Sequence, residues 1–170
     1  YYLLQKIKMQ TLQQLENKIY TLKALDFKVR DWKKNKKKIV FTNGCFDILH
    51  QGHIDILAKS ADLGNKLIVA INSDDSIKKL KGDERPITKQ KTRSMLLASF
   101  SYIDAVIIFE EDTPLKLIQK LMPDVLAKGE DYQKHDIVGY KEIIENGGDV
   151  ITIPLTQGFS TTNIVNQLKR

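Results

Sequence analysis

Short and almost wholly apolar segments recur along this sequence, separated by segments long enough to form helices. The apolar segments read as strands, and they span residues 39–42, 66–71, 105–109, 124–127 and 150–153. Continuous apolar runs of this kind are typical of strands that are buried on both faces of a parallel sheet. The sequence between them predicts helices over residues 52–63, 88–100, 113–122 and 134–145, then a last helix that begins at Ser160. We therefore expect an α/β fold, with a Rossmann-like parallel five-stranded sheet and helices on both faces.

Residues 1–38 differ in composition from the rest and are predicted to form an N-terminal helical arm, while residues 39–170 form the main domain. The arm holds 11 Lys or Arg and 3 Asp or Glu, a net charge of +8, whereas the remainder holds 16 and 18, a net charge of −2. A Lys-rich helix end is usually a solvated face, and the main domain is not basic, so nucleic acid is not an expected partner. The arm has an apolar residue every three or four positions, which indicates a helical segment with one apolar stripe and a second short helix after it. These positions are Leu12, Leu15, Ile19, Leu22 and Leu25, then Val29 and Trp32.

Hydropathy and cysteine content limit where the protein acts. No apolar run approaches the ~18 residues of a membrane-spanning helix, and no signal peptide is recognisable, so we expect no membrane partner. Cys45 is the single cysteine, which rules out an intramolecular disulfide and fits the reducing cytoplasm in which we expect the protein. Tyr1–Lys8 precede Met9 and carry no motif, so we expect this segment to be dispensable for activity.

The strongest chemical signal lies in residues 42–53, T-N-G-C-F-D-I-L-H-Q-G-H, which join the first strand of the main domain to its first helix. A helix N-terminus in this position directs backbone N–H groups toward a bound phosphate. We expect Gly44 to let the chain turn sharply and Gly52 to leave room for that phosphate. His50 and His53 are three residues apart, so their imidazoles can sit side by side and donate hydrogen bonds to phosphoryl oxygens. The alternative, a core histidine beside a capping one, is less favoured because two of the three histidines share this short array.

Two segments in order resemble the signatures of the cytidylyltransferase-like nucleotidyltransferases. Residues 44–53 resemble their HxGH signature, and residues 158–164, G-F-S-T-T-N-I, resemble their C-terminal signature, which holds the triphosphate in that family. The G-x-G-x-x-G of dinucleotide-binding folds is absent, as it is from that family. Narrower features over residues 38–169 resemble the D-glycero-β-D-manno-heptose 1-phosphate adenylyltransferase family. They are Asn43-Gly44-Cys45, Asn72-Ser73-Asp74, Lys81-Gly82, Arg85-Pro86-Ile87, residues 111–115, residues 123–126 and residues 128–132.

The resemblance implies roles for individual residues. As catalytic residues it implies His50, His53, Lys81 and Arg85, the last two in a mobile cationic lid. As nucleotide-binding residues it implies Thr42, Asn43, Gly44, Cys45, Phe46, Gly52, Arg93, Lys128, Gly129, Phe159, Ser160, Thr161 and Thr162. As substrate-binding residues it implies Asp47, Asn72, Asp74, Glu130 and Asp131, with Glu130 standing where the family usually has Gly. For Arg93 a solvated surface position is the alternative, and Cys45 is expected to be a small packing residue and not a nucleophile.

The implied reaction is adenylyl transfer from ATP to a heptose 1-phosphate, giving ADP-heptose and pyrophosphate for lipopolysaccharide precursor synthesis. Mg²⁺ is expected as cofactor, held mainly by the ATP phosphates, so no metal ligands are predicted in the chain. The resemblance predicts the form without a sugar-kinase domain, and it leaves a homodimer open. A glycerol-3-phosphate cytidylyltransferase and a non-catalytic nucleotide-binding regulatory module remain alternatives.

Overall fold

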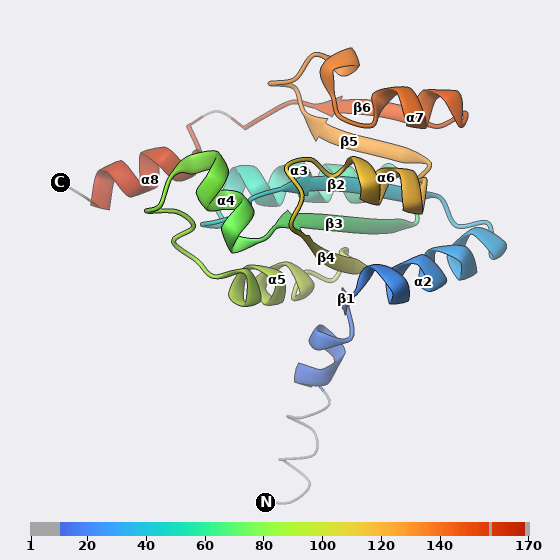
Figure 1. The fold of residues 1–170 in the computed structure, drawn as a ribbon, viewed down its shortest axis with the longest axis horizontal. Helices are drawn as coiled ribbons and strands as arrows, with labels where there is room; N and C mark the ends of the chain where they lie inside the picture. Colours follow the sequence, from blue (N-terminus) through green and yellow to red (C-terminus); the bar gives the residue numbers. More distant parts are fainter. Residues whose placement is uncertain (1–10, 157, 169–170) are drawn as a thin grey trace, which may run out of the picture.

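The described part of the chain, residues 11–156 and 158–168 of a computed structural model, is built on one parallel sheet. Its six strands lie in the order β1-β4-β3-β2-β5-β6, as Figure 1 shows. Their bounds are β1 (Ile19–Tyr20), β2 (Ile39–Gly44), β3 (Lys66–Asn72), β4 (Ala105–Phe109), β5 (Val125–Gly129) and β6 (Asp149–Ile153). From β2 the chain builds outward through β3 and β4, then returns to place β5 and β6 on the other side of β2. The strand order therefore reverses between β2 and β5, which is where ligands bind in open α/β sheets.

Helices cover both faces of the sheet, as the sequence predicted. One face packs against α2 (Leu22–Lys34), α6 (Leu115–Leu121) and α7 (Tyr140–Glu145), and the other against α3 (Gln51–Ala61) and α5 (Gln90–Ala98). Successive strand residues point to opposite faces, so Ile39 and Phe41 join the first core while Val40 joins the second. Two more helices, α4 (Asp74–Lys81) and α8 (Thr161–Leu168), follow the carboxyl ends of β3 and β6.

The N-terminal arm is not one helical segment. Residues 11–16 are helical, but Ile19 and Tyr20 form β1, a sixth strand that pairs in parallel with Val106 and Ile107 of β4. Thr21 then caps α2, because its side chain accepts a hydrogen bond from the backbone N–H of Ala24 at 3.4 Å. The expected five-stranded sheet thus gains a short edge strand from outside the main domain. The expected dispensable segment, Tyr1–Lys8, lies outside the described residues.

Two other predictions of secondary structure differ from the fold. The sequence predicted no helix between residues 72 and 88, but Ser73 caps α4 by accepting from the Ser76 N–H at 3.1 Å. The single helix expected over residues 134–145 is divided into a 3₁₀ turn, Lys134–Asp136, and α7. Gly139, with φ of 90°, separates them, because this left-handed conformation cannot continue a helix.

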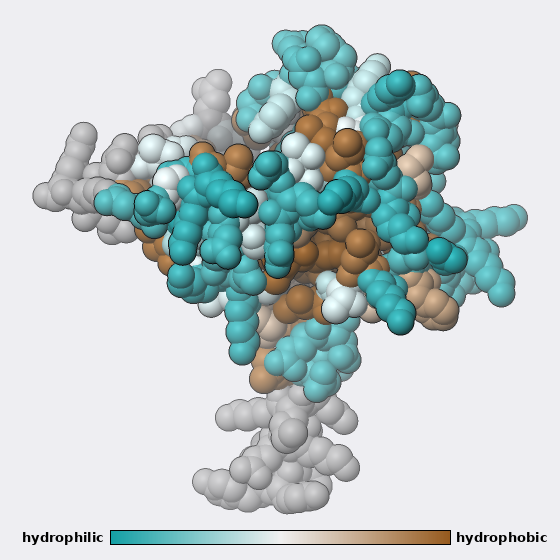
Figure 2. All heavy atoms as spheres, in the orientation of Figure 1, coloured by the Kyte–Doolittle hydropathy of each residue, from teal (hydrophilic) through white to brown (hydrophobic). Residues whose placement is uncertain are grey.

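The surface agrees with this layered arrangement. Figure 2 shows hydrophilic side chains over α4 and a hydrophobic area between α4 and α2. Among the described residues, no helix is long and apolar enough to cross a membrane.

Candidate active site

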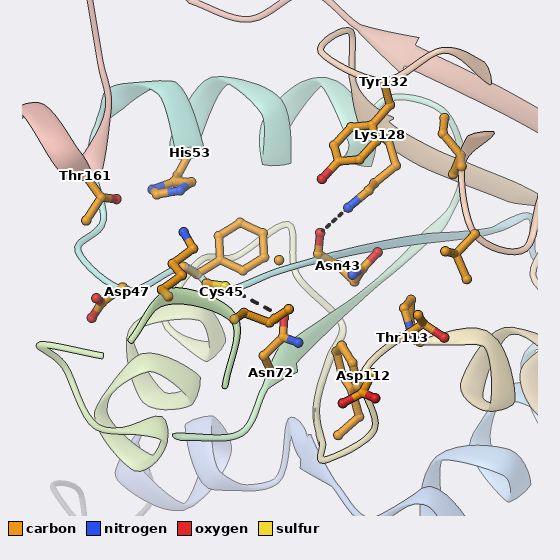
Figure 3. Close-up of a pocket in the computed structure, with 18 of the residues that line it drawn as sticks. Asn43, Cys45, Asp47, His53, Asn72, Asp112, Thr113, Lys128, Tyr132 and Thr161 are labelled. Atoms are coloured by element: carbon orange, nitrogen blue, oxygen red, sulfur yellow. Dashed lines mark hydrogen bonds between the residues drawn. The ribbon is translucent and has the colours of Figure 1, made fainter. Parts of the chain in front are cut away.

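A cleft with two connected lobes opens at the carboxyl ends of the strands. The first lobe, of about 500 Å³, extends toward Asn72, Phe109 and the start of α6. The second lobe, of about 380 Å³, extends toward the starts of α3 and α8. Several residues line both lobes, and they are Asn43, Gly44, Cys45, Phe46, His53, Lys81, Lys128, Tyr132 and Thr161. They come from β2 and β5, from the loops that follow these strands, and from α3, α4 and α8. Figure 3 labels Asn43, Cys45, His53, Lys128, Tyr132 and Thr161 among them.

The loop between β2 and α3 turns at Phe46 and not at Gly44. Phe46 has a φ of 47°, in the left-handed region, whereas Gly44 continues β2. Gly44 matters through its lack of a side chain, because a Cβ there would lie 3.0 Å from the Phe46 ring. A Cβ on Gly52 would lie 3.2 Å from the His50 ring. Both glycines therefore make room for the aromatic rings of the cleft, and the expected sharp turn at Gly44 is wrong.

His50 and His53 form a stacked pair at the start of α3. Their ring centroids are 3.8 Å apart and the ring planes are inclined by 23°. The Nδ1 atom of each ring is buried without a hydrogen-bond partner among the described residues. Burial lowers the pKa of both rings. For His53 the neighbouring His50 and Lys81 lower the pKa further, to about 4. Both rings are therefore neutral at pH 7 and can each donate one N–H.

Two helix starts face the second lobe. His50 is the N-cap of α3 but makes no side-chain cap. The His53 N–H donates to the His50 carbonyl at 2.9 Å, so the N–H groups before it are the ones that can meet an anion. Across the lobe, Thr161 of α8 lies opposite His53 (Figure 3). The segment before α8 is tied to α3, because Thr156 Oγ1 and Asp55 Oδ2 share a hydrogen bond at 2.5 Å. Two partial positive helix ends thus converge on one space.

Asp47 ties this loop to the segment that precedes α5. The Asp47 carboxylate is 2% exposed and accepts from Arg85 Nε at 2.6 Å, Ile87 N–H at 3.0 Å and Thr88 N–H at 2.7 Å. Burial alone would raise the pKa of Asp47, but these three hydrogen bonds together hold it below its usual value. Asp47 therefore orients the loop. Its partner Arg85 is not among the described residues that line the cleft.

Arg93, a buried residue of α5, also links this helix to the loop after β2. Its side chain is 0% exposed, and the guanidinium donates to three backbone carbonyls and one carboxylate. The acceptors are Thr88 O, Cys45 O, Asn72 O and Asp74 Oδ1, at 2.9, 2.7, 2.8 and 2.9 Å. The alternative of a solvated Arg93 is wrong, and every guanidinium nitrogen is already engaged within the protein. Arg93 and Asp74 accordingly hold the ends of β2 and β3 together behind the cleft.

Comparison with known proteins decides the family. Residues 41–167 match the cytidylyltransferase-like family, which is three quarters of the chain. The chain belongs to the cytidylyltransferase-like family. Within it, this domain is 52% identical over 134 residues to Bifunctional protein HldE of Sodalis glossinidius, covering 79% of this chain and 28% of that protein. It is 48% identical over 159 residues to Bifunctional protein HldE of Helicobacter pylori, covering 94% of this chain and 33% of that protein. The chain thus spans about a third of the length of these relatives.

Solved structures share the fold of this cytidylyltransferase-like domain. The lipopolysaccharide core biosynthesis protein from Thermoplasma volcanium matches with a TM-score of 0.58 and 28% identity, over 71% of this chain and 97% of that one. The pantoate-β-alanine ligase from Francisella tularensis, complexed with β,γ-ATP and β-alanine, matches with a TM-score of 0.58 and 18% identity, over 89% of this chain and 76% of that one. The second likeness concerns the fold alone.

Most residues to which the resemblance gave a role line the cleft of this cytidylyltransferase-like domain. Some of them lie in another element, or have other partners, than the sequence implied. Lys81 ends α4 and lines both lobes, although it was expected in a mobile cationic lid. Asn72 lines the first lobe. The implied nucleotide-binding residues that line only the second lobe are Thr42, Gly52, Gly129, Phe159, Ser160 and Thr162, and Asp131 joins them there. Glu130 is exposed and its Oε1 accepts from the Leu155 N–H at 3.2 Å, so its side chain serves the loop after β6.

Residues to which the sequence analysis assigned no role also line the cleft. Asp112 and Thr113 follow β4 and lie in the first lobe beside Asn72, and Tyr132 lies against Lys128 (Figure 3). Asp112 and Thr113 stand after a strand at the same edge of the sheet as the HxGH loop. Their position directly after a predicted strand is the sequence signal that could have identified them as cleft residues, because the carboxyl ends of parallel strands meet at one edge.

Proposed function

We propose that this chain transfers the adenylyl group of ATP to a heptose 1-phosphate, giving ADP-heptose and pyrophosphate. The observation that carries the proposal is the stacked, neutral His50–His53 pair at the start of α3, facing Thr161 of α8 across the second lobe. Neutral imidazole donors and two helix N-termini suit a triphosphate better than a neutral ligand. The motif resemblance to heptose 1-phosphate adenylyltransferases and the likeness to Bifunctional protein HldE support the acceptor.

In this proposal the second lobe holds ATP and the first lobe holds the acceptor. An oxygen of the sugar phosphate attacks the α-phosphorus in line, the bond from that phosphorus to the β-phosphate oxygen breaks, and pyrophosphate leaves. The attacking oxygen is already anionic, so the step needs no general base, and catalysis consists of positioning and charge stabilisation. His50 and His53 would donate to the α-phosphate, where negative charge is redistributed in the transition state.

Mg²⁺ would be bound mainly by the phosphates of ATP. Among the described residues, no group of three or more His, Cys, Asp or Glu side chains is arranged to hold a metal ion. A cation carried by the nucleotide fits such a site, since Mg²⁺ in nucleotide sites commonly keeps waters and phosphate ligands. Its contribution would be to neutralise charge on the departing pyrophosphate.

Pyrophosphate release tests the proposal. Purified protein is assayed with ATP and with CTP, each against heptose 1-phosphate and glycerol 3-phosphate, in the presence of Mg²⁺. We expect turnover with ATP and heptose 1-phosphate. Preference for CTP with glycerol 3-phosphate would replace the proposal with the cytidylyltransferase alternative, and nucleotide binding without turnover of any pair would favour a regulatory module. A cytoplasmic homodimer is proposed as the working form, and sedimentation velocity tests its oligomeric state.

A further inference from the structure

The sheet opens between β2 and β5. β2 pairs with β3 along its whole length, from Ile39 to Gly44, and β5 pairs with β6 as far as Gly129. In contrast, β2 and β5 pair only through Val40 with Val125 and Phe41 with Leu126. Beyond these pairs the two strands separate at the point where the strand order reverses. The cleft begins in this gap.

Lys128 bridges the gap with its side chain. Lys128 Nζ donates to the backbone carbonyl of Asn43 at 3.1 Å, a bond that Figure 3 marks across the opening. The same ammonium lies 4.9 Å from the centroid of the Tyr132 ring. A side-chain cation thus takes the place of a strand–strand hydrogen bond.

The charge of Lys128 is only weakly compensated. No ion pair found among the described residues includes Lys128. Asp131 is the acidic side chain that favours the charged form of Lys128 most, and Cys45 contributes less. Burial lowers the pKa of Lys128, which means that its surroundings favour the charged form less than water does. A partly buried ammonium with one carbonyl and one ring face as partners would gain from a phosphate anion.

The two lobes differ in what they offer to an anion. The second lobe has the starts of α3 and α8 and the His50 ring. The first lobe shares His53 and Thr161 with it but lacks His50, Gly52 and Ser160, and the cations among its described lining residues are Lys81 and Lys128. A sugar phosphate dianion in the first lobe therefore depends on these lysines, and Lys128 stands where the first lobe meets the second.

We propose that Lys128 binds the phosphate of the acceptor, the attacking group, and holds it beside the α-phosphate of the nucleotide. This inference rests on the proposed function and departs from the nucleotide-binding role that the sequence implied. Lys128 would leave the Asn43 carbonyl when the acceptor enters and would reduce the repulsion between two anions that must approach each other. Tyr132 is then a positioning residue, because its ring limits the directions in which the lysine can point.

Separate measurements of the two ligands test this assignment. Lys128→Met is compared with the wild type for the KM of heptose 1-phosphate and for the calorimetric Kd of α,β-methylene-ATP, an analogue that cannot be cleaved at the α-phosphate. We expect the acceptor KM to rise at least about tenfold, as for loss of one charged hydrogen bond, and the analogue Kd to stay within about twofold. Lys128→Arg should recover part of the acceptor affinity, and Lys141→Met, on the exposed side of α7, serves as the matched control.

Four outcomes decide between the alternatives. A weakening of α,β-methylene-ATP binding as large as the rise in acceptor KM would assign Lys128 to the triphosphate and overturn the inference, as would an unchanged acceptor KM. Calorimetry of heptose 1-phosphate without nucleotide provides the test that does not depend on turnover. Equal binding of this sugar phosphate by the wild type and Lys128→Met overturns the inference, whereas absence of pyrophosphate release from the wild type overturns the proposed function.

Discussion

The His50–His53 stack limits how much charge the site can hold. Two imidazolium ions with centroids 3.8 Å apart would repel strongly, and the buried position adds a desolvation cost to the charged form of either ring. Both rings therefore meet a phosphate as neutral donors at pH 7. A neutral donor gains strength when negative charge accumulates on its acceptor, which is what a transition-state donor requires.

Replacing either histidine by alanine is expected to lower kcat by roughly 10²–10³, because one donor to the phosphoryl oxygens is lost. The measurement is steady-state pyrophosphate release for His50→Ala and His53→Ala, with circular dichroism to show that folding is kept. His135, an exposed histidine outside the cleft, provides the control His135→Ala. Near-normal turnover in either cleft variant would remove that residue from the mechanism.

His53 also makes stability depend on pH. Its folded pKa of about 4 lies below the ordinary value of 6.5, so the unfolded chain binds a proton more readily between these values. The contribution of the neutral ring is therefore complete above pH 6.5 and is lost as pH falls toward 4. Allowing for partial exposure, we expect His53 to account for about 1–2 kcal/mol of the loss in unfolding free energy between pH 7 and pH 5. Urea unfolding of the wild type and His53→Gln at both pH values measures this, and an equal loss in both proteins would contradict it.

At the scale of elements, two buried charged groups join the HxGH loop to the segment before α5. Asp47 reaches from the loop to the backbone of Ile87 and Thr88, and Arg93 reaches back from α5 to the Cys45 carbonyl. Each side chain forms hydrogen bonds with several backbone groups at the ends of helices and strands, where regular secondary structure supplies no partner. The loop is thus held from both directions.

Arg93→Met is expected to lower the free energy of unfolding by about 3–5 kcal/mol, because it leaves Asp74 and three carbonyls without their buried partner. Arg30→Met is the matched control, since the Arg30–Asp26 pair is 70% exposed on the arginine side and should contribute less than about 1 kcal/mol. Both values come from urea unfolding at pH 7. Similar losses in the two variants would show that the Arg93 contacts contribute little.

The edge strand β1 is expected to serve stability and not chemistry. Ile19 is half-buried against the second core, and three strands, β4, β3 and β2, separate β1 from the gap beside β5. Ile19→Ala should lower the free energy of unfolding by about 1–2 kcal/mol, less than for a fully buried isoleucine, with kcat unchanged. Thermal unfolding and pyrophosphate release are measured on the same preparation. A fall in kcat without loss of stability would mean that the arm influences the cleft.

At the scale of the whole molecule, the cleft is assembled from segments that are far apart in the chain. Asn43 of β2, Asn72 of β3 and Lys128 of β5 meet there because parallel strands present their carboxyl ends at one edge. In the proposed function the two lobes hold the nucleotide and the acceptor separately, and base choice then depends on the second lobe.

We expect ATP to exceed CTP by at least about tenfold in kcat/KM, equivalent to roughly 1.4 kcal/mol of transition-state discrimination. A few hydrogen bonds to the edge of the base are sufficient for a difference of this size. Competition between the two nucleotides at a fixed concentration of heptose 1-phosphate measures the ratio directly. A ratio below one would reverse the assignment of the base while leaving nucleotidyl transfer in place.

The sequence by itself determined the α/β class, the positions of the main strands and the HxGH array at the start of α3. These features are local, because burial on both faces of a strand, a capping residue or a strand–helix junction is written in neighbouring residues. Membership of the cytidylyltransferase-like family agrees with what those motifs implied.

Only the tertiary structure decided the features that depend on which segments become neighbours. Ile19 fits the helical spacing of its surroundings, yet it forms β1 because the open edge of β4 supplies hydrogen-bond partners that a local pattern cannot show. Arg93 was implied as a nucleotide-binding residue, with a surface position as the alternative, yet its guanidinium is enclosed by the ends of β2 and β3. Lys128 meets the Asn43 carbonyl because β2 and β5 separate after two residue pairs, and that separation follows from the strand order and not from either strand's own sequence.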